Sequence, residues 1–400
     1  MCSVATVSAP RSRNAGRLAV GVASLVVVII PSYLTGTLAI SMGAELGFTP
    51  ALLGVLMAMR FAAAAASSAA AGRWVQKFGA TGGMRVAVLT VAGTSIVIGL
   101  FVRNPIVFAA LFCLNGAALA IVQPAVDIWV ARSVPVRQQG LAFGVKQAAV
   151  PTAALVAGVA VPAAAAGAGW RVVWLAAAAA ALLTAALVPW RGGRATETPS
   201  DSVGVKRERR SVADLAVLAV CFGFGSTAVV NLTTFLVVST VSAGFDEGTA
   251  GAVFAASSTT GIAARLTLGY WADRIKGDLL VVLAGVLTAG AGAFMLLGLT
   301  AGTSYVVAAP IAFAFGLGWP GLLLLVVVRE NQQAPGVATG FVNTGSYVGS
   351  IVGPAVFGLL TTRLGYSAGW LFTACCLLAS AAAALVARAM LRRRSSLVAS

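Results

Sequence analysis

Apolar runs of about twenty residues recur along the chain, separated by short polar or glycine-containing segments. Twelve such runs can be counted, at 18–40, 50–71, 84–102, 105–130, 139–166, 171–190, 212–240, 247–270, 279–300, 304–328, 336–360 and 367–387. A helix of about twenty residues crosses roughly 30 Å of hydrocarbon while satisfying its own backbone hydrogen bonds. Because no strand-like alternation is visible, the pattern predicts an all-α membrane protein with twelve transmembrane helices.

One long polar segment divides the twelve runs into two sets of six. It has the sequence RGGRATETPSDSVGVKRERRS, and a segment of this composition is typical of a flexible linker. The predicted organisation is therefore an N-terminal segment 1–17, a six-helix bundle 18–190, a linker 191–211, a second six-helix bundle 212–390 and a tail 391–400.

The two sets of six share a residue pattern in the same order and, to within one residue, at the same spacing. The matched pairs are Gly47 and Gly244, Gly54 and Gly251, Gly72 and Gly269, Pro124 and Pro320, Gly140 and Gly336, Gly169 and Gly365, and Trp174 and Trp370. Such a parallel repeat relates two bundles by an axis along the membrane normal and places a solute site between them, near the midplane. We therefore expect two pseudo-two-fold-related bundles.

The composition supports this fold class and changes the interpretation of the charge. The chain is 59% hydrophobic with a mean hydropathy of +0.96, outside the range of soluble domains. Its net charge is +16, and most of its basic residues are predicted in the loops of one side. The only basic residues predicted in the opposite loops are Arg103, Arg171 and Arg363. This asymmetry predicts both termini in the cytoplasm, in a cytoplasmic (inner) membrane. The basic excess indicates attraction to anionic membrane lipids rather than to nucleic acid.

Motifs that would support an enzyme are missing from the sequence. No G-x-x-x-x-G-K-[ST] phosphate loop and no G-x-S-x-G motif occurs, and the chain has no histidine. Four of the five cysteines lie in predicted spans and fit small buried side chains. We therefore expect no catalytic residue, no metal site and no cofactor.

The stretch GYWADRIKG, Gly269 to Gly277, resembles the signature loop of the major facilitator superfamily, with a Gly, three residues, an Asp and then basic residues. Gly169-Trp170-Arg171 also resembles sequences of that family, and the likeness covers nearly the whole chain. The resemblance, to the bacterial twelve-helix type, implies two six-helix bundles and a secondary transporter that works by alternating access.

The same resemblance implies a cytoplasmic clasp, in which Asp273 contacts the start of the fifth helix. A carboxylate is stabilised at a helix N-terminus, so the contact is physically reasonable. The first half has Gln76 at the matching position, which lacks the charge and predicts a weaker clasp onto the eleventh helix. These segments, which we expect in loops, could alternatively serve only as topology anchors. The residues predicted to act in gating are Gly72, Gln76, Lys77, Gly269, Asp273 and Arg274.

Ionisable residues within spans are costly and are therefore candidate functional residues. Arg60 is ten residues into its helix, roughly 15 Å deep, which favours contact with an anionic ligand, a water-filled cavity or an internal acidic partner. Lys146 is a second candidate for solute contact, with a snorkelling lysine as the alternative. Asp127 suits a salt bridge to a nearby basic residue or a role in proton coupling. Arg265 is interpreted as structural.

Polar and aromatic residues near mid-depth complete the predicted solute site. The resemblance implies that helices 1, 4, 7 and 10 line the cavity, and polar groups in lipid contact would be unsatisfied. The predicted substrate-binding residues are Arg60, Lys146, Gln147, Tyr33, Gln123, Asn231, Trp319, Asn343 and Tyr347.

Small residues at four-residue spacing mark two aligned helices. They are Gly345, Gly349 and Gly353 on the eleventh helix and Ala149, Ala153 and Ala157 on the fifth. Such spacing lets helices approach closely. We interpret it as the moving contact between the two halves, with ordinary helix packing as the alternative.

The predicted function is transport of a small anionic organic solute, because Arg60 and Lys146 face a single peripheral acid. Protons are a candidate coupling ion, and a monomer is expected. Efflux of drugs or metabolites is an alternative on the same fold, and a non-transporting membrane sensor is an alternative of another class. The sequence leaves all three open.

Overall fold

The computed structural model describes residues 11–133, 145–189, 212–272, 274, 277–299, 303–331 and 335–399. In this part of the chain all regular structure is helical. The N-terminal half contains α1 (Arg11–Thr37), α2 (Ala39–Leu46), α3 (Pro50–Phe78), α4 (Ala80–Phe101), α5 (Pro105–Ser133), α7 (Ala149–Ala163), the π-helical turn η2 (Ala164–Ala168) and α8 (Gly169–Leu187). The C-terminal half contains α9 (Val212–Ser242), α10 (Glu247–Ala272), α11 (Leu279–Leu299), α12 (Thr303–Gly318), α13 (Pro320–Glu330), α14 (Pro335–Leu364) and α15 (Tyr366–Ala399).

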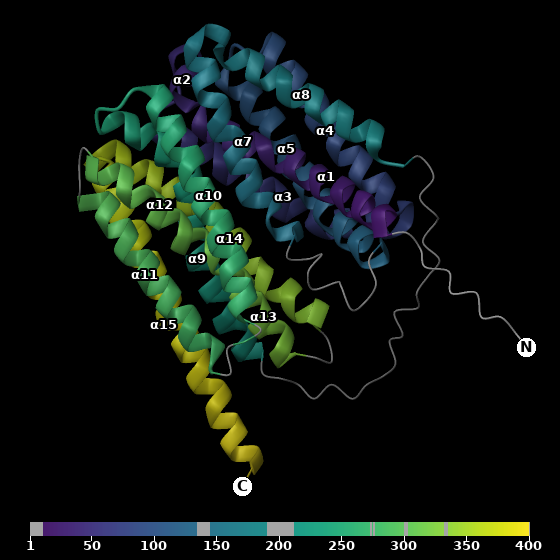
Figure 1. The fold of residues 1–400 in the computed structure, drawn as a ribbon, viewed down its shortest axis with the longest axis vertical. Helices are drawn as coiled ribbons and strands as arrows, with labels where there is room; N and C mark the ends of the chain where they lie inside the picture. Colours follow the sequence, from purple (N-terminus) through teal and green to yellow (C-terminus); the bar gives the residue numbers. More distant parts are fainter. Residues whose placement is uncertain are drawn as a thin grey trace, which may run out of the picture.

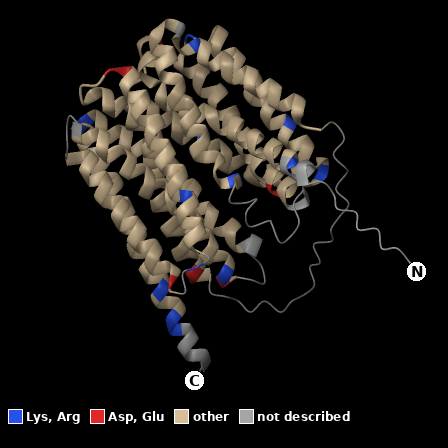
Figure 2. Ribbon diagram, viewed as in Figure 1, with Lys and Arg blue, Asp and Glu red and all other residues tan. Residues whose placement is uncertain are grey.

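The helices form an elongated bundle in which α1 begins and α15 ends at the same end, the termini end, while α2 lies at the opposite end (Figure 1). Eleven helical segments among the described residues are long and apolar enough to cross a membrane. The other long helix, α10, coincides with the predicted run 247–270. Charged residues gather toward the helix ends, and the ribbons between them are almost free of charge (Figure 2). The chain is therefore a multi-pass membrane protein.

The predicted repeat is visible in the backbone conformation. Gly47 and Gly244, which precede the second helix of each half, both have positive φ angles, of 68° and 102°. Gly169 and Gly365, which precede the last helix of each half, have φ angles of 73° and 83°. Side chains other than glycine rarely adopt such angles. The matched glycines of the sequence therefore mark equivalent turns in the two halves.

Two predicted boundaries differ from the structure. The run predicted to end at residue 71 continues as α3 to Phe78, so Gly72, Gln76 and Lys77 lie on a helix. Their predicted placement in a loop is wrong, because the segment after Gly72 continues the helical hydrogen bonding to Gly79. The predicted tail 391–400 also continues α15 as far as Ala399. The predicted linker 191–211 lies outside the described residues.

The glycine stripe of α14, formed by Gly345, Gly349 and Gly353, packs on α9 within the same half. A Cβ added at Gly345 would lie 1.9 Å from the carbonyl oxygen of Ala219, and one at Gly349 would lie 1.9 Å from that of Gly223. The interpretation of this stripe as the moving contact between the halves is therefore wrong. Its small residues serve the close approach of two neighbouring helices.

The halves meet instead along two antiparallel helix pairs. In the first, α3 packs on α14, with Gly54 against the carbonyl of Pro354 and Gly358 against the carbonyl of Pro50. We call this the α3–α14 interface. Six residues along α3 from Gly54, the same register places Arg60 at the level of Tyr347 and Val348 of α14. Tyr347, one of the predicted substrate-binding residues, thus lies near Arg60.

The second pair, the α7–α10 interface, has the same antiparallel arrangement. Gly251 packs against Val161, and Gly158 packs against Ala255. Toward the opposite end the halves also meet where Gly36 of α1 lies against the backbone of α9, and where the Ser41 hydroxyl donates a 2.8 Å hydrogen bond to Glu247 of α10. The two interfaces therefore enclose the central region in which Arg60 lies.

Candidate solute site between the halves

Arg60 lies deep inside the protein and has no acidic partner among the described residues. Its side chain is 1% exposed, and its Nη2 donates a 3.2 Å hydrogen bond to the carbonyl oxygen of Val28 on α1. The guanidinium carbon is 5.5 Å from the ring centroids of both Phe61 and Phe112, and Nε has no hydrogen-bond partner. An arginine has five N–H donors and stays charged. Arg60 is therefore a buried cation with unused hydrogen-bonding capacity.

Two tyrosines accompany Arg60. Tyr33 of α1 is 5% exposed and lies within electrostatic range of Arg60 and of Arg265. Tyr347 of α14 is half-buried and lies within electrostatic range of Arg60. These predicted site residues therefore converge from both halves on one region.

Arg265 joins the same region from α10 of the C-terminal half. Its Nε donates a 2.7 Å hydrogen bond to the carbonyl of Leu317, and its Nη1 donates a 2.6 Å hydrogen bond to the carbonyl of Gln147 in the other half. The sequence analysis interpreted Arg265 as structural and did not foresee the contact across the halves. Its spacing of fourteen residues, close to four helical turns, from Gly251 on the face that meets α7 is the signal that could have indicated it.

Lys146 is paired internally. Its Nζ lies 2.5 Å from Oδ1 of Asp127, and the two side chains are 9% and 44% exposed. The salt bridge proposed for Asp127 is therefore present, and Lys146 contributes no uncompensated charge in this conformation. The central positive charge comes from Arg60 and Arg265 instead.

Removing the charge of Asp127 and removing the charge of Lys146 should reduce the stability of the protein by different amounts. Asp127→Asn leaves a nearly buried ammonium without a partner, so we expect a loss of about 3 kcal/mol of stability. Lys146→Met leaves a carboxylate that water reaches, so we expect a loss of less than about 1 kcal/mol. Thermal unfolding of the purified variants measures both, and the double variant should recover most of the loss. Equal losses for the two single variants would contradict the unequal burial as the cause.

Asn231 and Trp319 lie inside the C-terminal half rather than facing the other half. Nδ2 of Asn231 donates a 3.0 Å hydrogen bond to Thr373 on α15. The Trp319 indole is fully buried against Phe222 and Gly225 of α9, and its Nε1 donates to the carbonyl of Gly316. The expectation that both side chains point toward the centre is wrong, because Nδ2 of Asn231 and Nε1 of Trp319 both donate to groups of the same bundle. Oδ1 of Asn231 has no hydrogen-bond partner among the described residues.

Three predicted site residues occupy intermediate positions. Gln123 is half-buried on α5, and Gln147 is half-buried and accepts from Arg265 through its backbone. Asn343 is exposed and lies one turn before Tyr347 on the same face of α14.

The structure describes only some of the residues that were predicted to form the cytoplasmic clasp. Arg274 donates a 3.0 Å hydrogen bond to the carbonyl of Tyr270 and lies 3.5 Å from the centroid of its ring, while Gly269 is exposed near the end of α10. Lys77 lies over the ring of Phe78. Asp273 and the expected start of the fifth helix lie outside the described residues. The clasp therefore stays a prediction.

An ion cluster that the sequence analysis missed lies where α11 begins. Asp278 caps α11 through Leu280 and binds Arg388 of α15 at 2.6 Å and Arg392 at 3.3 Å. Burial alone would raise the pKa of Asp278, but the hydrogen bonds and the two arginines hold it below its ordinary value. The spacing of Arg388 and Arg392, one helical turn apart on one face, was the available signal.

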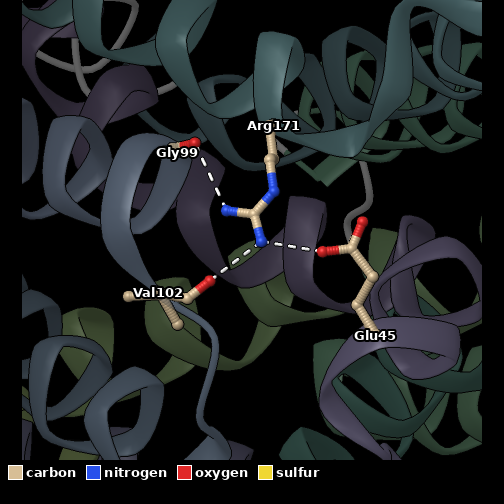
Figure 3. A network of polar contacts seen from close by, with 4 residues as sticks. All are labelled: Glu45, Gly99, Val102 and Arg171. Carbon is tan, nitrogen blue, oxygen red and sulfur yellow. Dashed lines mark hydrogen bonds and ion pairs between the residues drawn. The ribbon is translucent and has the colours of Figure 1, made fainter.

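A second cluster lies at the opposite end, where Arg171 joins α2, α4 and α8 (Figure 3). Its Nη2 lies 2.7 Å from Oε2 of Glu45 and 3.0 Å from the carbonyl of Val102, and its Nη1 reaches the carbonyl of Gly99 at 3.5 Å. The hydrogen bond from Arg171 lowers the pKa of Glu45. A cation at the C-terminal carbonyls of a helix is favourable, so this cluster fastens the N-terminal half.

The family follows from comparison with known proteins. The family model of the Major Facilitator Superfamily matches residues 20–354. The chain belongs to the Major Facilitator Superfamily. A comparison with curated proteins found no match.

Solved structures of Major Facilitator Superfamily transporters share this fold. One is a bacterial homologue of the human lysosomal transporter Spinster in an inward-facing and occupied conformation, with a TM-score of 0.74 and 15% identity over 95% of this chain and 98% of that one. The nucleoside transporter NupG has a TM-score of 0.73 and 14% identity over 93% of this chain and 99% of that one. The xylose transporter XylE from E. coli has a TM-score of 0.73 and 12% identity over 92% of this chain and 98% of that one. Because it belongs to the Major Facilitator Superfamily, the chain is a transporter, of a family that takes small-molecule substrates, and not an enzyme. Identities this low concern the fold alone.

Proposed function

We propose that this chain is a secondary transporter that moves a small organic anion across the cytoplasmic membrane by alternating access. The observation that supports it is Arg60, which is buried between the halves with no carboxylate beside it among the described residues. A buried charge without a partner costs several kcal/mol. An anionic solute would supply the missing charge and would bind most strongly at this point.

The transport cycle follows from the placement of Arg60. At 1% exposure its guanidinium is closed to solvent in this conformation. A solute would reach it when the halves rock about the α3–α14 and α7–α10 interfaces. Asp127 is the candidate for proton coupling, and in this conformation it is paired with Lys146.

A ligand screen tests the proposal. The melting temperature of the purified protein is measured with small carboxylates, sulfonates, phosphates and lipophilic cations. The compounds that stabilise the protein are then tested for uptake into proteoliposomes. A ligand that binds only the folded state stabilises it by mass action, by about 2.7 kcal/mol at a ligand concentration of a hundred times Kd, and so raises the melting temperature. We expect an anion to stabilise the protein and to be transported. Stabilisation by bulky neutral or cationic compounds alone would overturn the proposal in favour of drug or metabolite efflux.

A further inference from the structure

Arg265 is a second central cation, and the hydrogen-bond partners of its half-buried side chain are neutral groups. Its hydrogen bonds go to the carbonyls of Leu317 and Gln147, and no carboxylate is paired with it in the part of the chain that the structure describes. Carbonyl dipoles compensate a guanidinium less completely than a carboxylate does. Arg265 therefore adds to the charge that the central region leaves unbalanced.

The two arginines come from different halves and converge on Tyr33. Arg60 belongs to α3 of the N-terminal half, Arg265 belongs to α10 of the C-terminal half, and Tyr33 lies within electrostatic range of both. Arginine side chains on α10 point back toward its N-terminus, which directs Arg265 from the termini end toward the centre. The region between the halves therefore holds two guanidinium groups.

The central region consequently has a charge of two that no described side chain offsets. The nearby pair of Lys146 and Asp127 is neutral as a unit. We propose that the transported solute carries two acidic groups, one bound by Arg60 and the other by Arg265. This inference rests on the proposed function. The solute would then balance both charges and contact both halves at once.

The spacing of the two arginines favours two separate acidic groups over one doubly charged group. In the repeat Arg265 corresponds to Ser68, which follows Arg60 by two helical turns, about 12 Å along the axis. Each guanidinium is also held by its own carbonyl, Val28 for Arg60 and Leu317 for Arg265. A compact tetrahedral anion such as phosphate would have to draw both away from these anchors. A dicarboxylate, whose two acidic groups are separated by a carbon chain, would let each guanidinium keep its own carbonyl.

Binding at Arg265 would also change a contact between the halves. The Nη1 group that would receive the solute now donates to Gln147 across the α7–α10 interface. A carboxylate is the stronger acceptor for a guanidinium. Occupation of the site would therefore release this contact, which links the presence of solute to the movement of the halves.

The test compares each dicarboxylate with its own monomethyl ester, which keeps the carbon chain and removes one charge. Binding of malonate, succinate, glutarate and adipate, of their monoesters and of inorganic phosphate is measured by calorimetry on the full-length protein. We expect at least one dicarboxylate to bind about tenfold more tightly than its monoester, the amount expected for one hydrogen bond to a charged group. The Arg265→Gln variant should bring that ratio close to one, whereas Arg265→Lys should keep part of it.

The ratio separates a binding role from a structural one. If Arg265 only supported the fold, Arg265→Gln would weaken the diacid and the monoester equally and leave the ratio as in the wild type. The control Arg363→Gln, at an exposed arginine near the end of α14, should also leave the ratio unchanged.

The outcomes also distinguish this inference from the proposed function. If the monoesters bind as well as the diacids, the inference fails while anion transport stands. If phosphate binds most tightly and loses its affinity in Arg265→Gln, the site takes a compact dianion and the two-group inference fails. If no anion binds, both proposals fail.

Discussion

Replacing Arg60 by glutamine is expected to abolish anion binding while leaving the empty protein at least as stable as the wild type. Truncating one partner of a buried charge pair costs about 2–5 kcal/mol of affinity, so Kd should rise by at least about 30-fold. Without ligand, however, the substitution removes a 1% exposed charge that has no acidic partner among the described residues. Replacing such a charge by a neutral group is neutral or stabilising. Melting temperature with and without the anion measures both effects.

Two further variants give this prediction its controls. Arg60→Lys keeps the charge but loses the planar fork, and it should retain part of the affinity. Arg363→Gln removes an exposed arginine near the end of α14 and should change neither quantity. If Arg60→Gln melts well below the wild type without ligand and binds the anion normally, then Arg60 has a structural role and the site lies elsewhere.

The second large effect concerns the glycine stripe of α14. In Gly349→Ala the new methyl group would lie 1.9 Å from the carbonyl oxygen of Gly223, and backbone on both sides prevents it from moving aside. Nearby hydrogen bonds depend on the same close approach, from Ser226 to Ser346 and from Thr227 to the carbonyl of Gly349. We expect a loss of about 3 kcal/mol or more, seen as a lower melting temperature and reduced yield of folded protein.

The matched control is Gly285→Ala on α11. No atom lies within 4 Å of a Cβ added there, so the alanine meets open space. Because alanine is the better helix former, this variant should be unchanged or more stable by about 0.5–1 kcal/mol. A loss at Gly285 as large as that at Gly349 would show that the α9–α14 contact is not the cause.

Much of the fold was predictable because the bilayer imposes one period and one length on every span. The apolar runs located the helices, and the glycine pairs Gly47 with Gly244 and Gly169 with Gly365 located equivalent turns. Helix ends were less predictable, because α3 continues to Phe78 through charged residues that a hydropathy window counts as loop. The partner of the stripe on α14 was also missed, since small residues signal close approach without naming the neighbour.

The site was predictable in its most costly member. An arginine in the middle of an apolar run is rare, so Arg60 was identified from its depth in the span alone. Asn231 and Trp319 were wrongly expected to point toward the centre. Their partners, Thr373 and Gly316, are local to the C-terminal bundle. Arg265 was underestimated because its contact with Gln147 depends on how two bundles meet. That information lies in the packing of the halves and not in either helix.

The polar character of α10 has a consequence for how the protein is made. This long helix lies outside the eleven segments that are apolar enough to cross a membrane on composition alone. Its neighbour α7 and Gln147, which lies just before α7 and accepts one hydrogen bond from Arg265, belong to the half that leaves the ribosome first. When α10 is synthesised, one of the two acceptors of its arginine is therefore already in place, whereas Leu317 follows later. A C-terminal bundle made alone would lack the acceptor at Gln147.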